Sequence, residues 1–347
     1  MTSYDTVKIQ LGESPRTWLI TGVAGFIGSH LLEALLTLNQ RVIGLDNFAT
    51  GFQKNLDDIR KKVTPDQWAL FRFVEGDICS TADCLGAFNA ISEPVDFVLH
   101  QAALGSIPRS LADPLATHET NITGFTKMLI ASHENQVKRF VFASSSSVYG
   151  DSPDLPKCEH IVGKPLSPYA LSKSVNEQYA EIFAKCFGLS YVGLRYFNVY
   201  GPRQNPAGAY AAVIPKWINA IVQNEVVYIN GDGSTSRDFC HVTNVVQANI
   251  LAATCTDTAA RNQVYNIALG DRTSLNELHQ LIHDTLKHDF LSLQDLLPVY
   301  QNERIGDVKH SLANIAKAEK LMGYVPSIFI SSGLKNTCEW FLKSSQK

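Results

Sequence analysis

A glycine-rich turn between two apolar runs near the start of the chain restricts the possible folds more than any other feature. Residues 17–21 (TWLIT) predict a short buried strand, and the segment 22–28 (GVAGFIG) follows directly. Leucines spaced for one face of a helix come next, and a second apolar run at 41–46 ends in Asp46. Strand, glycine turn, helix and strand in this order predict a βαβ unit. Small residues in such a turn let the backbone approach a pyrophosphate, which rests on the positive end of the helix.

Asp46 supports a dinucleotide site and favours one cofactor. It lies 18 residues after Gly28, at the end of the second predicted strand. A carboxylate there can accept hydrogen bonds from an adenosine ribose, whereas a 2′-phosphate would meet like charge. The sequence therefore predicts NAD as the cofactor, in preference to NADP.

Apolar runs and helical patterns continue to alternate beyond this unit. Further strands are expected near 70–74, 95–100, 139–143 and 190–195, and helices near 114–135, 168–187, 211–222, 273–287, 312–322 and 331–344. Repeated β/α units with buried strands specify an open, mostly parallel, doubly wound α/β sheet of the Rossmann type. We assign residues 17–197 to this NAD-binding domain and 1–16 to a partly helical leader. Residues 198–347 are expected to form a smaller α/β substrate-binding domain, with segments that return to the main sheet.

Polar and small residues follow several of the predicted strands. Asp77 comes after one strand, Gln101 after the next, and the serine run 144–147 after a third. Asp77 could reach an adenine edge or cap the following helix, and the sequence leaves both open. Four serines could form a flexible loop, but the apolar strand before them directs them into the crevice at the carboxyl ends of the strands. Ligands of doubly wound sheets bind in that crevice.

A tyrosine and a lysine one helical turn apart form a candidate acid/base pair. Ser167 is a good N-cap and Pro168 suits the first helical position, so Tyr169 and Lys173 are expected on one face of a new helix. A phenol with a pKa of about 10 is a poor base near neutral pH, and an adjacent cation favours its ionised form. By itself this spacing is usually surface decoration, and it gains meaning only beside a cofactor site.

Composition and charge argue against several classes of function. The net charge of −3 is unlike that of a nucleic-acid-binding or polybasic membrane-binding protein. The seven cysteines are odd in number and never form C-x-x-C, and the ten histidines do not cluster, so reduced thiols and no metal site are expected. Neither a signal peptide nor a membrane-spanning apolar run is apparent. We expect a cytoplasmic protein with no nucleic-acid partner.

These motifs together resemble the extended short-chain dehydrogenase/reductase superfamily over nearly the whole chain. The resemblance lies in 21–28 (TGVAGFIG), 46–48 (DNF), 144–150 (SSSSVYG), Tyr169 with Lys173, and 194–198 (LRYFN). Within the superfamily, the UDP-hexose 4-epimerases are similar through 231–233 (GDG) leading to Arg237-Asp238, and through Arg304 with Asp307. The segments 201–206 (GPRQNP) and 209–216 (AYAAVIPK) resemble those of the UDP-N-acetylglucosamine 4-epimerases.

The resemblance implies a role for each matching residue. Ser145 would be the catalytic serine, Tyr169 the base, and Lys173 the residue that holds the nicotinamide ribose and tunes Tyr169. The residues implied in NAD binding are Gly22, Gly25, Phe26, Ile27, Gly28, Asp46, Asn47, Gly51, Asp77, Ile78, Gln101, Ala102, Ala103, Asn121, Tyr169, Lys173, Tyr196 and Val199. Those implied in substrate binding are Gly105, Ser106, Ser145, Ser146, Asn198, Gln204, Ala212, Val213, Lys216, Tyr228, Asn230, Arg237, Arg304, Asp307 and Ser311.

Among these, a diphosphate grip is implied for Asn198, Arg237 and Arg304, and a uridine-ribose contact for Asp307. Guanidinium groups suit phosphate oxygens, although a single arginine is more often a solvated surface cation. Lys216, Tyr228 and Asn230 would lie near the nucleotide.

Two departures from the family patterns bear on the reaction. Dehydratases of the superfamily carry Thr-Asp-Glu where this chain has Ser145-Ser146-Ser147, so it lacks the acid/base pair for removing water. Strict UDP-glucose/galactose members carry a bulky tyrosine where this chain has Ser311. A serine leaves room for a 2-acetamido group, unless it is a neutral surface replacement. Ser146, Gly105, Ser106 and Gln204 could line the same acetamido-binding wall.

The resemblance therefore implies NAD-dependent inversion at C4 of UDP-N-acetylglucosamine or UDP-N-acetylgalactosamine through a 4-keto intermediate. The nearest alternatives are the corresponding uronic acids or UDP-glucose and UDP-galactose as substrates. A net oxidoreductase or decarboxylase and a non-catalytic NAD sensor are further alternatives. The family also suggests a homodimer joined by the helices near 114–135 and 168–187.

Overall fold

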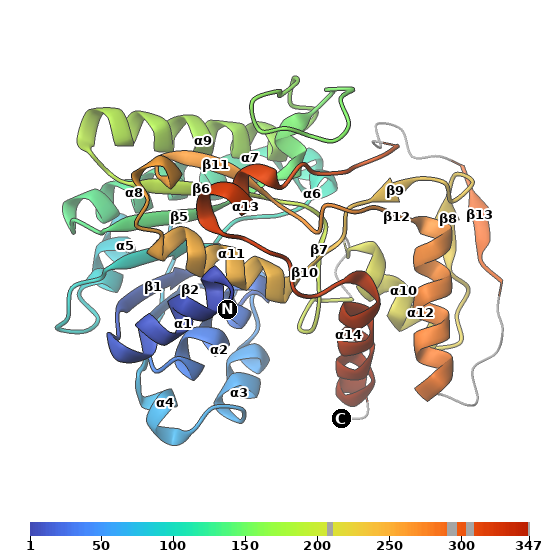
Figure 1. Ribbon diagram of the computed structural model, residues 1–347, viewed down its shortest axis with the longest axis horizontal. Coiled ribbons are helices and arrows are strands. Elements are labelled where there is room, and N and C mark those ends of the chain that lie inside the picture. Colours follow the sequence, from blue (N-terminus) through green and yellow to red (C-terminus); the bar gives the residue numbers. More distant parts are fainter. Residues whose placement is uncertain (207–210, 290–296, 303–308, 346–347) are drawn as a thin grey trace.

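A parallel sheet of seven strands forms the centre of the computed structural model, which describes residues 1–206, 211–289, 297–302 and 309–345 (Figure 1). The strand order is β3-β2-β1-β4-β5-β6-β11. The strands are β1 (Thr17–Thr21), β2 (Arg41–Asp46), β3 (Phe71–Glu75), β4 (Phe97–His100), β5 (Arg139–Ser145), β6 (Tyr191–Tyr196) and β11 (Gln263–Ile267). The order reverses between β1 and β4, as in a doubly wound Rossmann sheet. The predicted fold class is confirmed.

Helices cover both faces of this sheet. On one face α2 (Phe26–Thr37) packs against α11 (Val242–Thr254), and α1 (Ser3–Glu13) lies against α11. On the other face α8 (Phe125–Glu134) packs between α5 (Thr81–Phe88) and α9 (Pro168–Phe187). Two apolar clusters, one on each face, bury the strands; every residue of β1 is buried. This two-sided burial explains why the strands read as continuous apolar runs.

The helix that carries the candidate acid/base pair begins and ends as its sequence predicts. The Ser167 hydroxyl accepts a hydrogen bond of 3.1 Å from the Ala170 amide, and Pro168 occupies the first turn. The helix ends at Gly188, whose φ of 72° is left-handed and is easily adopted by glycine. Tyr169 and Lys173 are therefore set on one face by local geometry alone.

The predicted helix at 114–135 is not one regular helix. It consists of α7 (Pro114–His118), a π-helical stretch η1 (Glu119–Gly124) and α8. Within the π-helical stretch the Asn121 carbonyl accepts a 2.6 Å hydrogen bond from the Asn176 amide of α9. A side chain from a neighbouring helix thus donates a hydrogen bond to this backbone group. The sequence near residue 121 cannot predict such a contact. π-Helical turns occur frequently at functional sites.

A smaller lobe lies at one end of the molecule and has its own core (Figure 1). It is built from α10 (Val213–Val222), β8 (Tyr228–Asn230), α12 (Leu275–Asp289), β13 (Val299–Gln301) and α14 (Ile330–Ser345). Of two short strand pairs, β7 (Val199–Tyr200) with β10 (Cys240–His241) lies between this lobe and the main sheet, and β9 (Ser236–Arg237) with β12 (Thr273–Ser274) lies against the lobe, where β12 contacts α12. The chain crosses back, because α11 and β11 belong to the main sheet and α13 (Ala316–Met322) packs on β11.

Short helices complete the structure: α3 (Gln53–Arg60), α4 (Pro65–Ala69), α6 (Ile107–Ala112), η2 (Ser146–Tyr149) and η3 (Thr258–Ala260). In the described part of the chain, none of the helices has both the length and the apolar character that crossing a membrane requires. Within the first sixteen residues, predicted as a leader, Ser3–Glu13 form α1, and its Leu11 is buried in the core cluster on that face of the sheet.

Candidate functional site

Two cavities lie at the carboxyl ends of the main strands and share part of their walls. The first has a volume of about 340 Å³ and extends over the glycine turn, while the second, of about 510 Å³, extends past the serine run. The residues common to both linings are Phe26, Ile27, Gln101, Ala103 and Gly105. The two cavities therefore form one continuous cleft.

The first cavity gathers most residues predicted to bind NAD. Its lining includes Gly22, Gly25, Phe26, Ile27, Gly28, Asp46, Asn47, Asp77, Ile78, Gln101, Ala102 and Ala103. Gly22 has a φ of 70°, and a Cβ on Gly28 would lie 2.1 Å from the Gly22 carbonyl oxygen. Only glycines allow this turn to close onto the start of α2, which has no side-chain cap and so leaves its first amides for a phosphate. The residues present fit a dinucleotide.

Asp46 holds the glycine turn in addition to lining the cavity. Its carboxylate accepts hydrogen bonds of 2.8 Å from the amides of Ala24 and Phe48. Burial raises the pKa of Asp46, and these two bonds oppose that rise. A carboxylate oxygen can accept more than one hydrogen bond, so the predicted ribose contact is compatible with both.

Asp77 does not cap the next helix, because Ser80 is the N-cap of α5. One Asp77 oxygen accepts from the Cys79 amide at 2.8 Å and the other from the Asn47 amide group at 3.0 Å. Its place in the cavity lining favours the alternative in which it meets the cofactor.

Asn121 and Gly51 were implied in NAD binding but do not line either cavity. The Asn121 side chain bonds the Leu104 amide at 2.8 Å, the Leu104 carbonyl at 3.0 Å and the Ser172 hydroxyl at 3.2 Å. Gly51 packs against the backbone of Ala24, where a Cβ would be 2.9 Å from the carbonyl carbon. Both residues support the cavity wall from behind.

The three predicted catalytic residues meet in the second cavity. Ser145 accepts hydrogen bonds from the Ser147 amide at 3.2 Å and the Ser147 hydroxyl at 2.9 Å. Its interaction with the Tyr169 side chain lowers the phenol pKa. The Lys173 ammonium lies 5.9 Å from the centre of the Tyr169 ring. A phenol, a hydroxyl and an ammonium can thus move and hold a proton at one place.

The pKa of Tyr169 corrects one expectation. Burial raises it, and the interaction with Ser145 only partly opposes that rise. The Lys173 ammonium donates to the Ala143 carbonyl at 2.7 Å and lies 5.9 Å from the centre of the Tyr169 ring. Burial lowers the pKa of Lys173 to about 8, and the nearby Glu177 carboxylate opposes this. The chain alone does not make Tyr169 a strong base.

The second cavity is lined mostly by neutral residues, many of them small. The predicted substrate residues found there are Gly105, Ser106, Ser145, Ser146, Asn198, Gln204 and Ala212, and the predicted cofactor residues Tyr196 and Val199 join them. Among the described lining residues Lys173 alone carries a charge. Ser106 has a φ of 90°, a strained backbone for a residue with a Cβ, and such strain costs about 1–3 kcal/mol.

Comparison with known proteins places the chain in a family. The pattern of the NAD dependent epimerase/dehydratase family matches residues 18–268. The chain belongs to this family. NAD is therefore its cofactor, as the sequence predicts.

Several proteins similar to this chain are named for UDP-sugars. A putative UDP-glucose 4-epimerase of Methanocaldococcus jannaschii is 35% identical over 329 residues, which are 94% of this chain and 99% of that protein. The solved UDP-N-acetylglucosamine 4-epimerase of Methanobrevibacter ruminantium M1, in complex with UDP-N-acetylmuramic acid, is 37% identical with a TM-score of 0.85 over 95% of this chain and 99% of that one. The Thermotoga maritima UDP-glucose 4-epimerase with UDP-glucose is 35% identical with a TM-score of 0.84 over the same shares.

The other residues predicted to bind the substrate do not line the second cavity. They are Val213, Lys216, Tyr228, Asn230, Arg237 and Ser311. The Arg237 guanidinium donates to the Ser236 carbonyl at 3.0 Å, and the Ser311 amide donates to the same oxygen at 3.0 Å. The structure thus brings Arg237 and Ser311 together. Arg304 and Asp307 lie outside the described residues.

Asp238 and Asn249 also support the site, although the sequence predicted no role for either side chain. Asp238 is fully buried, and its carboxylate accepts hydrogen bonds from the amides of Leu269, Gly270 and Ala313 at 2.9, 3.1 and 3.1 Å. Asn249 accepts hydrogen bonds from Gln101 at 3.0 Å and from the Tyr196 hydroxyl at 3.2 Å. Asp238 follows Arg237 in the family motif, and that adjacency was the available clue.

Proposed function

We propose that this protein is an NAD-dependent 4-epimerase that interconverts UDP-N-acetylglucosamine and UDP-N-acetylgalactosamine through a 4-keto sugar. The observation that carries the proposal is the meeting of Ser145, Tyr169 and Lys173 in a cavity continuous with the NAD cavity. A carbinol bound there would lie beside a proton acceptor and the cofactor at once.

Tyr169, Ser145 and Lys173 each have a separate role in the proposed reaction. Tyr169 takes the proton of the 4-hydroxyl, and Ser145 holds that oxygen by a hydrogen bond. Bound NAD would supply the acceptor for the hydride of C4 and, once reduced, the hydride donor for the opposite face. Lys173 holds the nicotinamide ribose, and its charge together with that of oxidised nicotinamide favours ionised Tyr169 in spite of burial. Tyr169 returns the proton after the 4-keto sugar has turned its other face.

Inversion requires a firmly held UDP and a loosely held hexose. Asn198, Arg237 and Arg304 are proposed to bind the diphosphate and Asp307 the uridine ribose, with Lys216, Tyr228 and Asn230 near the nucleotide. The hexose would meet the small residues of the second cavity. Small side chains leave room for the sugar to turn while UDP stays bound.

Dehydration is not proposed, although the family name includes it. Removal of water across C5 and C6 needs an acid and a base beside the serine, and hydroxyls occupy those positions at Ser146 and Ser147. Neither residue is ionised near neutral pH.

Gln204 supports an acetylated sugar. Its amide nitrogen donates to the Val199 carbonyl at 3.2 Å, which orients the side chain. Its Oε1 is buried without a hydrogen-bond partner. An unsatisfied buried acceptor is costly, and the N–H of an acetamido group would satisfy it. Ser311, a small residue beside Arg237, is compatible with the same group.

The charge of the cavity favours a neutral hexose over a uronic acid. Lys173, the charged residue among the described lining residues, already donates to Ala143. Because Lys173 is also proposed to hold the nicotinamide ribose, a C6 carboxylate would have no cation of its own among the described lining residues. UDP-glucose is the stronger alternative, since relatives named for glucose and for N-acetylglucosamine are similarly close.

Incubation with UDP-N-acetylglucosamine, without added NAD, tests the proposal. Proton NMR of the products should show UDP-N-acetylgalactosamine, with neither NADH nor CO2 accumulating. A clear preference in kcat/KM for UDP-glucose or for the uronic acid would overturn the assignment of substrate. Accumulation of NADH would identify a net oxidoreductase, and release of CO2 a decarboxylase.

We also propose a cytoplasmic homodimer. Large apolar side chains stay exposed on α6, α7 and α9, among them Leu111, Leu115, Leu171, Ile182 and Phe187. These helices pack on one another, so the residues lie on neighbouring elements. Exposed apolar groups on adjacent helices suit a second copy that covers them by helix packing. All seven cysteines are free thiols, as is usual in a reducing compartment.

A further inference from the structure

Glu177 joins the catalytic helix to the end of the strand that carries the catalytic serine. The hydroxyl of Ser144, the residue before Ser145, donates to Glu177 Oε1 at 2.5 Å. Glu177 lies one turn after Lys173 and two turns after Tyr169, so the three share a face of α9. A carboxylate acceptor makes this hydrogen bond a strong one.

Arg195 fixes the Glu177 carboxylate from the neighbouring strand. Its guanidinium donates through Nε to Oε1 at 2.9 Å and through a terminal nitrogen to Oε2 at 2.8 Å. Arg195 is the register partner of Ser144 in the β5–β6 pair, and it is only 4% exposed. Such a two-pronged pair leaves the carboxylate little freedom to rotate.

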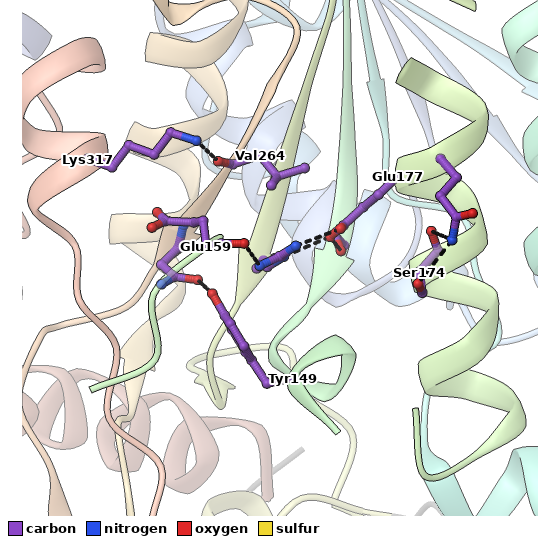
Figure 2. A network of polar contacts seen from close by, with 10 residues as sticks. Tyr149, Glu159, Ser174, Glu177, Val264 and Lys317 are labelled. Carbon is purple, nitrogen blue, oxygen red and sulfur yellow. Dashed lines mark hydrogen bonds and ion pairs between the residues drawn. The ribbon is translucent and has the colours of Figure 1, made fainter. Parts of the chain in front are cut away.

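The contacts around Arg195 extend further. The guanidinium also donates to the Glu159 carbonyl at 2.9 Å, and it stacks 4.9 Å from the centre of the Tyr149 ring. The Tyr149 hydroxyl donates to Asn266 of β11 at 2.6 Å. Figure 2 shows Tyr149, Glu159 and Glu177 around this network.

Three successive turns of α9 therefore meet the end of β5. Tyr169 interacts with Ser145, Lys173 donates to the Ala143 carbonyl, and Glu177 accepts from the Ser144 hydroxyl. The third contact is the one in which neither partner belongs to the catalytic set. It holds the residue that directly precedes Ser145 at the end of the strand.

We infer that Glu177, held by Arg195, is a positioning residue that fixes Ser145 relative to Tyr169 and Lys173 through its hydrogen bond to Ser144. The inference rests on the proposed function of those three residues. Glu177 touches neither NAD nor substrate in this account. A small displacement of Ser145 would spoil the alignment of the reacting groups, and a 1 Å misplacement can cost about 100-fold in rate.

Three variants test this role in the full-length, NAD-bound enzyme. Glu177→Gln removes the charge that holds Arg195 and places an amide N–H opposite a guanidinium N–H. Ser144→Ala removes only the hydroxyl and leaves the Glu177–Arg195 pair intact. Glu181→Gln is the matched control, because Glu181 lies one turn further on α9 and pairs with Lys185 at the surface.

We expect kcat to fall about 100-fold in Glu177→Gln and about tenfold in Ser144→Ala, with KM and NAD content within about twofold of the wild-type values. Glu181→Gln should match the wild type. In the double variant the two losses should not multiply, because both act on one contact. Amide hydrogen exchange over residues 143–149 should quicken in both single variants but not in Glu181→Gln.

Unchanged kcat in Ser144→Ala, or losses that multiply in the double variant, would overturn the inference. A loss of kcat that only follows lost NAD or lost thermal stability would also overturn it. If Glu177→Gln does not fold, because removing one partner of a buried ion pair is strongly destabilising, Ser144→Ala decides alone. An active Tyr169→Phe enzyme would instead show that the proposed function has failed.

Discussion

The Lys173 ammonium donates a hydrogen bond of 2.7 Å to the carbonyl oxygen of Ala143. Ala143 lies two residues before Ser145 on β5, so the lysine ties α9 to the strand that carries the proposed catalytic serine. One proton of the ammonium serves this contact and two others stay available for the nicotinamide ribose. The protein itself therefore orients the Lys173 side chain, whose ammonium lies 5.9 Å from the centre of the Tyr169 ring.

Tyr169→Phe should lower kcat about 1000-fold, because it removes the proposed proton acceptor while keeping the ring. The bound NAD, measured by its absorbance after denaturation, should stay near one per chain. Tyr179→Phe on the same helix is the control, since Tyr179 is exposed and remote from the cavity. Turnover of Tyr169→Phe at the wild-type rate would contradict the assigned role.

Ser311→Tyr should lower kcat/KM for UDP-N-acetylglucosamine about tenfold or more relative to UDP-glucose. The reason is steric, since a phenol ring would fill the space proposed for the acetamido group, and pocket contacts of this kind are worth about 10–200-fold. Ser311→Ala, which adds no volume, should leave the ratio unchanged. An equal loss for both sugars would show that residue 311 does not select the acetamido group.

Leu115→Glu should convert the proposed dimer to a monomer. Leu115 is 69% exposed on α7, and a charge there would be buried without a partner if a second copy covers it. Light scattering after size exclusion gives the mass. Leu297→Glu is the control, because Leu297 is 83% exposed and belongs to the segment that leads into β13. A monomeric wild-type protein would refute the proposed assembly.

His100→Asn should make the protein less sensitive to acid. Burial, with a smaller effect of the Lys173 cation, lowers the pKa of His100 to about 3. The unfolded chain takes up a proton near pH 6.5, so between these pKa values the unfolded state binds more protons and the free energy of unfolding falls as pH falls. From neutral pH to about pH 4 the loss is about 3 kcal/mol.

Urea unfolding of both proteins, repeated across this pH range, measures the effect. The substituted asparagine keeps an acceptor for the Thr21 hydroxyl, which lies 2.9 Å from the His100 Nδ1, but does not titrate. The other ionisable groups are common to both proteins, so only the difference in pH dependence is compared. Parallel curves for the two proteins would show that His100 does not resist protonation.

Much of the fold could be predicted because its signals are local. The βαβ unit, the glycine turn and the boundaries of α9 depend on apolar spacing, on caps and on residues a few positions apart. The smaller lobe was harder to delimit. Its chain leaves and returns to the main sheet through α11 and β11, and no local pattern marks which sheet a strand will join.

For the candidate site, spacing placed Tyr169 and Lys173 on one helical face, and the ends of parallel strands brought Asp46, Asp77 and Gln101 to one edge. The sequence predicted that a neighbouring cation would favour ionised Tyr169. The structure instead raises the pKa of Tyr169, because the whole fold buries the side chain. Asn121 was likewise implied in cofactor binding, yet its side chain is occupied by Leu104 and Ser172.

The amino-acid sequence by itself determined the sheet type, the cofactor and the helix that carries the acid/base pair, since each follows from contacts within one or two turns or one βαβ unit. Only the tertiary structure decided that Lys173 is directed at Ala143, that Gln204 has a buried unpaired oxygen, and that Glu177 holds Ser144. Ser144 and Glu177 are 33 residues apart on different elements. Contacts of that range depend on how a strand and a helix pack, and packing is a property of the whole core.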